Sequence, residues 1–153
     1  MRLTDLLSPE RIACKTSAPS KKRALEKLSE LISSASPRVG AIEVFDSLLA
    51  RERLGGTGVG YGVAIPHGRL KNEETTLGAF ISLEQAIDFD AVDKQPVDLL
   101  FALLVPEQST DEHLQALASI ATMFKDGGMR ERLRQASSDS ELYELIAEWQ
   151  KTH

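Results

Sequence analysis

The chain has 153 residues, a length that suits one domain over residues 1–153. Its formal net charge of −5 argues against nucleic acid or an anionic membrane as a partner, although a local basic cluster is compatible with that charge. Its longest apolar run, Leu99 to Val105, is far shorter than the roughly 20 residues of a membrane-spanning helix. Since the single cysteine, Cys14, cannot form an internal disulfide, we expect a cytoplasmic protein without membrane insertion or a nucleic-acid partner.

Two amphipathic helices are predicted in the first third of the chain. The first begins after Ser20, a good N-cap residue, and has apolar residues at helical spacing between positions 24 and 32. A short loop at 33–37 follows. The second helix ends near Arg53, because Gly55 and Gly56 come next. Its apolar stripe consists of Ile42, Phe45, Leu48 and Leu49.

Strands are predicted in the middle of the chain. The run Leu77–Leu83 is one candidate and Ile87–Phe89 is a short second one. The run Val97–Val105 is almost wholly apolar, as expected of a strand that is covered on both faces, and it ends at Pro106.

Helices return after the strands. The segments Ser109–Glu112 and Ser138–Glu141 both match the capping box, and a helical apolar stripe follows each of them. Between these two helices, Gly127 and Gly128 interrupt the pattern, and Met129–Gln135 is a short helix of its own. Helices at both ends around central strands predict an α/β sandwich, with a strand order that the pattern leaves open.

The segment from Arg51 to Arg69 is the most unusual part of the chain, because it holds six of the ten glycines. Glycine permits close backbone approach and leaves amide N–H groups open to an anion. The glycines fit neither the phosphate loop G-x-x-x-x-G-K-[ST] nor the dinucleotide motif G-x-G-x-x-G, which argues against a nucleotide site. A mobile glycine-rich connection would have the same composition.

His67 is the candidate nucleophile within this segment. It follows Pro66, which has a fixed φ and no N–H group, and precedes Gly68, which lets the chain turn sharply. Neutral imidazole is nucleophilic near pH 7, because its ordinary pKa is about 6.5, and it can form a phosphohistidine intermediate. An isolated histidine is more often structural, but the surrounding glycines and arginines favour a chemical role here.

Other side chains could assist His67. By the capping-box prediction, His113 lies in the first turns of a helix, where free N–H groups and the helix dipole favour a phosphate. An exposed helix histidine is the alternative. Arg51, Arg53 and Arg69 offer guanidinium groups to a phosphoryl group, although Arg51 and Arg53 could also be solvated at a helix end. We expect only one of these two to reach the site.

Other chemistries have less support. There is no H-E-x-x-H motif and no cysteine pair for zinc, and no G-x-S-x-G element for a serine hydrolase. Cys14 is more typical of a small, half-buried apolar residue than of a nucleophile. We therefore expect neither a metal nor a cofactor.

Several motifs together point to a known family. They are L-A-R-E-R-L-G-G-T-G at 49–58, G-V-A-I-P-H-G at 62–68, the run 89–106, and E-H-L at 112–114. With these motifs the chain resembles, over nearly its whole length, the enzyme IIA proteins of the bacterial phosphotransferase system, fructose/mannitol class. Together with S-K-K-R-A-L at 20–25, they are most similar to the nitrogen-regulatory branch of that family.

The resemblance implies a mixed β-sheet flanked by helices on both sides. It implies that His67 accepts a phosphoryl group, on Nε2, from a small HPr-like carrier that is itself charged from phosphoenolpyruvate through an enzyme I. His113 would hydrogen-bond the phosphoryl group or steady His67, and Arg51 would be the active-site arginine. With these roles, we expect Arg51 and the glycine amides to hold the phosphoryl oxygens, and apolar surface residues near His67 to exclude water when a partner docks.

Three functions remain open at this point. The first is a regulator whose phosphorylation state is sensed by signalling partners, which by the resemblance would include potassium-transport proteins and sensor kinases. The second is a sugar-transport IIA protein that passes phosphate to a separate IIB protein. The third is a non-catalytic small-molecule binding module that uses the glycines without phosphotransfer.

Overall fold

The computed structural model of the protein describes residues 2–71, 73–109 and 111–153, with the side chain of Glu112 also outside the description. The elements, in chain order, are α1 (Leu3–Leu6), the 3-10 helix η1 (Pro9–Arg11), β1 (Ile12–Thr16), α2 (Lys21–Ala35), α3 (Ala41–Leu54), β2 (Gly58–Gly60), β3 (Val63–Ala64), β4 (His67–Leu70), β5 (Leu77–Ile87), β6 (Val97–Pro106), α4 (Asp111–Lys125), α5 (Gly127–Gln135) and α6 (Asp139–Thr152).

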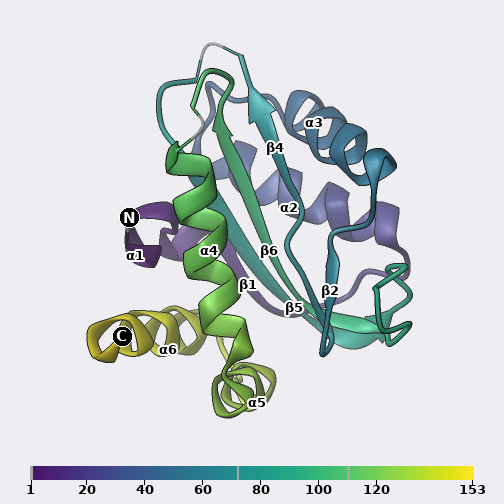
Figure 1. Ribbon diagram of the computed structural model, residues 1–153, viewed down its shortest axis with the longest axis vertical. Helices are drawn as coiled ribbons and strands as arrows, with labels where there is room; N and C mark the ends of the chain where they lie inside the picture. The colour runs from purple at the N-terminus through teal and green to yellow at the C-terminus, as the bar shows by residue number, and fades with distance from the viewer. Residues whose placement is uncertain (1, 72, 110) are drawn as a thin grey trace.

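Within the described part of the chain, six strands form one mixed sheet at the centre of the molecule (Figure 1). Their order in space is β1-β5-β6-β3-β2, and β4 also pairs with β6. β5 and β6 are antiparallel, whereas β1 is parallel to β5, and β3 and β4 are parallel to β6. β3 and β4 therefore follow one another along the same edge of β6, separated only by Ile65 and Pro66. This pairing places His67 at the start of β4, opposite Leu103.

Helices cover both faces of this sheet (Figure 1). α2 and α3 pack on one face, where Leu28 and Leu48 belong to one buried cluster. α1, α4, α5 and α6 supply the second cluster on the other face. Successive residues of β6 alternate between the two, with Leu100 in the first cluster and Phe101 in the second, because side chains along a strand point to opposite faces. The predicted fold class is confirmed, and none of the described helices has the length and apolar character needed to cross a membrane.

The predicted helix starts follow from their caps. The Oγ of Ser20 accepts a hydrogen bond from the backbone N of Arg23 (3.1 Å), and that of Ser138 accepts one from the backbone N of Glu141 (3.1 Å). The reciprocal bond of the second box is shifted by one residue, because the Glu141 carboxylate accepts from the backbone N of Ser137 instead of Ser138. The box predicted at 109–112 includes Thr110 and the Glu112 side chain, which lie outside the described residues.

Two helix predictions need correction. α2 continues to Ala35, so the predicted loop at 33–37 is shorter than expected. In α3 the predicted stripe is rotated: Ile42 is 78% exposed, and the buried face instead carries Val44 and Leu48. The buried face continues one turn later with Glu52. Because a charged residue occupies this position, the apolar pattern alone does not locate the buried face.

The strand predictions also need correction. Ile87–Phe89 is not a separate strand, because Ile87 ends an extended β5 whose pairing with β6 is interrupted by a register shift between Ser82 and Ile87. α1 and β1 were not predicted, since neither is long enough to show a periodic pattern. Cys14 lies in β1 and is half-buried; its Sγ donates to the carbonyl of Ala136 (3.2 Å).

Candidate active site

His67 is held by a hydrogen bond that defines its tautomer. Its Nδ1 lies 2.8 Å from the carbonyl oxygen of Ile65, two residues back along the chain. Because a carbonyl can only accept, Nδ1 must carry the proton, and Nε2 is left with a free lone pair. The carbonyl of the intervening Pro66 accepts from the backbone N of Leu103 (2.9 Å), which anchors this corner to β6. In the neutral ring this geometry leaves the Nε2 lone pair available.

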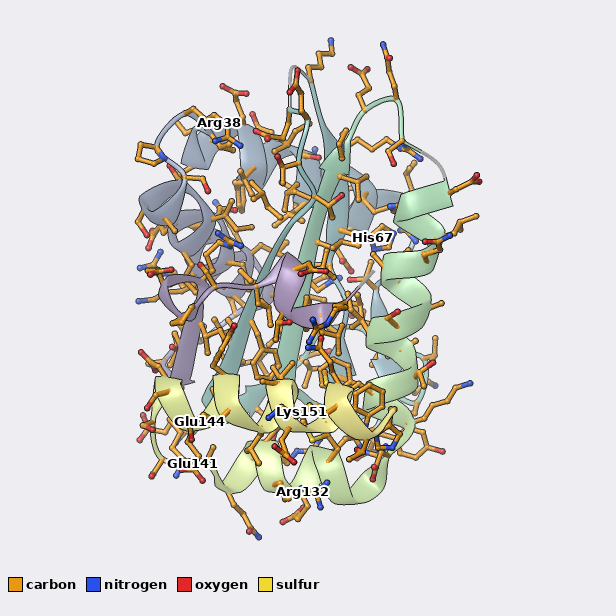
Figure 2. The ribbon with its side chains drawn as sticks, turned by 90° about the vertical axis from the view of Figure 1, so that its left-hand side faces the viewer. Arg38, His67, Arg132, Glu141, Glu144 and Lys151 are labelled. Carbon is orange, nitrogen blue, oxygen red and sulfur yellow. The ribbon has the colours of Figure 1, made fainter. Side chains whose placement is uncertain are left out.

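His113 lies beside His67, as the third residue of α4. The two ring centroids are 5.4 Å apart, and the ring planes are tilted by 53°. Figure 2 shows His67 next to the amino-terminal part of α4. The Nδ1 of His113 is buried and has no hydrogen-bond partner among the described residues. A buried ring nitrogen without a partner is uncommon in proteins, and a bound ligand or water is one of the explanations for it.

Arg51 approaches the same place from the last turn of α3. Its Nη1 donates to the carbonyl of Gly55 (2.7 Å). Arg53, which points to solvent, does not line the hollow at this site. Of these two arginines, Arg51 is the one that lines the hollow.

A surface hollow of about 400 Å³ brings these groups together. It is lined by Ser47, Ala50, Arg51, Leu54, His67, Gly68, Arg69 and His113. Exposed apolar side chains flank it, as we expected: Leu54 is 85% exposed, and Leu114, next to His113, is 64% exposed. Two histidines, two arginines and an apolar rim are suited to holding a small anion while a partner excludes water.

Both imidazoles are biased toward the neutral form. Burial lowers the pKa of His67 below the ordinary value of 6.5, and the charge of Arg51 acts in the same direction, against the hydrogen bond to Ile65. Burial also lowers the pKa of His113, with further contributions from the positive fields of His67, Arg69 and Arg51. A neutral His67 retains the Nε2 lone pair that nucleophilic attack requires.

We expect both histidines to titrate below pH 6.5 in an NMR titration of their ring protons, with the same rings in the urea-unfolded chain as reference. Between the lowered pKa values and 6.5, the unfolded chain binds more protons than the folded one. The free energy of unfolding should therefore fall as the pH is lowered through this interval. Ring titrations at or above the unfolded reference would contradict the geometry.

Residues 5–149 match the family model described as phosphoenolpyruvate-dependent sugar phosphotransferase system, EIIA 2. The chain belongs to this enzyme IIA family. The resemblance seen in its motifs is confirmed, and members of the family act in phosphotransfer.

Individual relatives show which branch of the IIA family the chain is similar to. The nitrogen regulatory protein of Pseudomonas aeruginosa is 43% identical over 150 residues, covering 98% of this chain and 97% of the relative. The nitrogen regulatory protein of Escherichia coli K12 is 47% identical over 158 positions, covering 99% and 93%. The crystal structure of nitrogen regulatory protein IIA-Ntr from Neisseria meningitidis matches with a TM-score of 0.85 at 41% identity, covering 92% and 96%. Within the IIA family, the chain is similar to the nitrogen-regulatory branch.

Close packing explains several glycines of this IIA chain, and Gly68 at the hollow is one of them. Residues 58–70 form β2, β3 and β4 instead of a mobile connection, and only one of the six glycines, Gly68, lines the hollow. The expectation that the glycine amides cradle the phosphoryl oxygens is therefore not supported. Gly68 is needed for close approach, because a Cβ there would lie 2.2 Å from Ser47 Oγ. Gly62 has a φ of +77°, which favours glycine at the turn between β2 and β3.

Glu52 is a residue of the IIA site region that sequence reasoning missed. It is buried at the end of α3, where its carboxylate accepts from the backbone N of Thr57 (2.9 Å) and from the Thr57 hydroxyl, and pairs with Lys21 Nζ (2.9 Å). These bonds tie α3 and the start of α2 to the first turn of the glycine segment. The signal that could have found it is its spacing of four from Leu48, on the buried face of α3.

Proposed function

We propose that this IIA chain, as one domain over residues 1–153 in the bacterial cytoplasm, accepts a phosphoryl group on Nε2 of His67 from a small HPr-like phosphocarrier. Its phosphorylation state then regulates partner proteins, such as potassium-transport proteins or sensor kinases. The observation that carries the proposal is the hydrogen bond from His67 Nδ1 to the Ile65 carbonyl, because it leaves Nε2 unprotonated at the edge of an anion-suited hollow.

The transfer needs positioning more than acid–base chemistry. The Nε2 lone pair attacks phosphorus in line with the scissile bond of the carrier's phosphohistidine. The new N–P bond forms as the old one breaks, and the electron pair of the old bond stays on the carrier's imidazole. No proton has to move when the carrier's phosphohistidine ring is protonated on its other nitrogen, because that ring then leaves as a neutral imidazole while Nδ1 of His67 keeps its hydrogen. The Ile65 carbonyl then stabilises the positive charge that develops on the substituted ring.

Two neighbouring groups have helper roles in this proposal. The Arg51 guanidinium neutralises charge on the phosphoryl oxygens. His113 is neutral, and its ring centroid lies 5.4 Å from that of His67. It orients the phosphoryl group or the attacking ring. The exposed side chains of Leu54 and Leu114 provide apolar contact to the carrier and so help to expel water.

Similarity to nitrogen regulatory proteins supports a regulatory role over sugar transport. The added phosphate brings negative charge and three acceptor oxygens to the surface around Leu54, which partners can distinguish from the free state. Transfer to a purified fructose- or mannitol-specific IIB protein would be the defining activity of the sugar-transport alternative.

The decisive experiment is incubation of the chain with phosphoenolpyruvate, an enzyme I and an HPr-like carrier, followed by intact mass spectrometry. We expect one phosphate adduct that is lost in mild acid and stable in base, as an N–P bond requires. Omission of the carrier is the control and should leave the chain unmodified. A chain that remains unmodified with all components present would overturn the proposal in favour of a binding module.

A further inference from the structure

Arg69 connects the strand that carries His67 with the segment that leads to His113. It is the third residue of β4, and its Nη1 donates to two backbone carbonyls, those of Glu107 (2.9 Å) and Ser109 (2.5 Å). Both carbonyls belong to the short connection between the end of β6 and the start of α4 at Asp111. The side chain of Arg69 thus links β4, which carries His67, to the segment that precedes α4, which carries His113.

The strand end of this connection is already anchored by the backbone. Arg69 pairs with Val105 in the parallel ladder, and the backbone N of Glu107 donates to the carbonyl of Leu70 (3.0 Å). On the other side, Ser47 Oγ donates to the carbonyl of Arg69 (2.8 Å), which fastens β4 to α3. The bond to Ser109 extends this rigid framework by two further residues toward α4.

We propose that Arg69 is a positioning residue, whose paired hydrogen bonds to Glu107 and Ser109 set the start of α4 so that His113 faces His67. The inference rests on the phosphotransfer proposed above. His113 is the third residue of α4, so a shift of the first turn of this helix moves His113 directly. A displacement of about 1 Å at a catalytic group is enough to slow a positioned reaction strongly.

The competing role for Arg69 is direct contact with the phosphoryl group or the carrier, because it also lines the hollow. The two roles differ in chemistry. A direct contact uses free donors and positive charge, whereas the positioning role uses Nη1, which is already occupied by two carbonyls. A lysine ammonium can donate to two carbonyls from one nitrogen, while methionine keeps the apolar stem and removes every donor.

We expect Arg69→Met to slow phosphoryl transfer to His67 about 10- to 100-fold, because the loss of both hydrogen bonds lets His113 shift away from His67. The loss should appear in kcat, with the KM for the carrier unchanged. Arg69→Lys should restore most of the rate. Arg132→Met, which removes the same charge from α5 at a distance from His67 (Figure 2), is the matched control and should transfer at the wild-type rate.

A double-mutant cycle with His113→Ala separates the two roles. If Arg69 acts through His113, the double variant Arg69→Met/His113→Ala should be no slower than His113→Ala alone. Multiplicative effects, or a rise in the KM for the carrier, would overturn the inference and assign Arg69 to direct contact.

A structural measurement keeps the inference testable even if phosphotransfer fails. The short contact between the rings of His67 and His113 should produce an NMR cross-relaxation signal in the wild type and in Arg69→Lys. The signal should be weakened or absent in Arg69→Met. An unchanged signal in the methionine variant would refute the positioning role, whereas a wild-type chain that takes no phosphate would refute only the proposed function.

Discussion

The His67→Ala variant is expected to take up no acid-labile phosphate when it is incubated with phosphoenolpyruvate, an enzyme I and an HPr-like carrier. The substitution removes the nucleophile itself, so we expect the rate of phosphorylation to fall by at least about 10³-fold. Intact mass spectrometry over a time course measures the loss directly. Because His67 is only half-buried at the edge of a hollow, the variant should fold, and a thermal melt checks this.

The matched control for this variant is His113→Ala, which removes the neighbouring imidazole. It should still become phosphorylated, at a rate lowered about 10- to 100-fold, because the hydrogen bond from a helper is lost while the nucleophile stays. His153→Ala removes the third histidine, at the end of α6, and should leave the rate unchanged. An adduct of normal yield on His67→Ala would refute the site assignment, and a wild-type rate in His113→Ala would refute the helper role.

Gly68→Ala is expected to lower the free energy of unfolding by about 1–3 kcal/mol and to reduce phosphorylation of the folded fraction. The added Cβ would lie 2.2 Å from Ser47 Oγ and 3.1 Å from the backbone C and O of Ser47. A side-chain rotation can relieve the first contact, but only separation of α3 from β4 relieves the backbone contacts. Overpacking of this kind destabilises a protein by a few kcal/mol, and the resulting shift moves His67, which is adjacent in β4.

Urea denaturation of four variants, each compared with the wild type, tests this prediction. Gly55→Ala is the control, because a Cβ at Gly55 meets no atom within 4 Å, and it should change stability by less than about 0.5 kcal/mol. Ser47→Ala loses its bond to the Arg69 carbonyl and should cost about 1 kcal/mol. The double variant Ser47→Ala/Gly68→Ala should recover part of the loss seen in Gly68→Ala. Equal stability of Gly68→Ala and Gly55→Ala would contradict the close contact between α3 and β4.

The long elements could be predicted because their patterns repeat. Helix α2 follows a continuous stripe and a clear N-cap at Ser20, and β6 follows a nearly unbroken apolar run that is buried on both faces. Shorter elements escaped prediction, since β3 has two residues and leaves no period to detect. The buried face of α3 was misplaced because Glu52, a charged residue, occupies a core position that only its partners Lys21 and Thr57 make acceptable.

The candidate site also has residues that the sequence predicted and residues whose roles it did not predict. Local sequence singled out His67, because Pro66 and Gly68 constrain the chain on either side of it, and it drew attention to Arg51. Sequence reasoning treated Arg69 only as a possible phosphate ligand, whereas its guanidinium bonds two carbonyls before α4. The glycines were interpreted as an anion cradle, but the close approach of α3 to Gly68 explains the one glycine at the site.

The sequence by itself therefore determined the long helices, the two-faced central strand and the family to which the chain belongs, because each depends on residues near one another along the chain. Only the tertiary structure decided that His113 lies beside His67, that Arg51 and not Arg53 reaches the hollow, and that the Ile65 carbonyl holds the Nδ1 proton. The reason is physical: the first two relations depend on how β4 pairs with β6 and how α3 and α4 cross the sheet, and the third depends on the turn that the backbone makes between two strands.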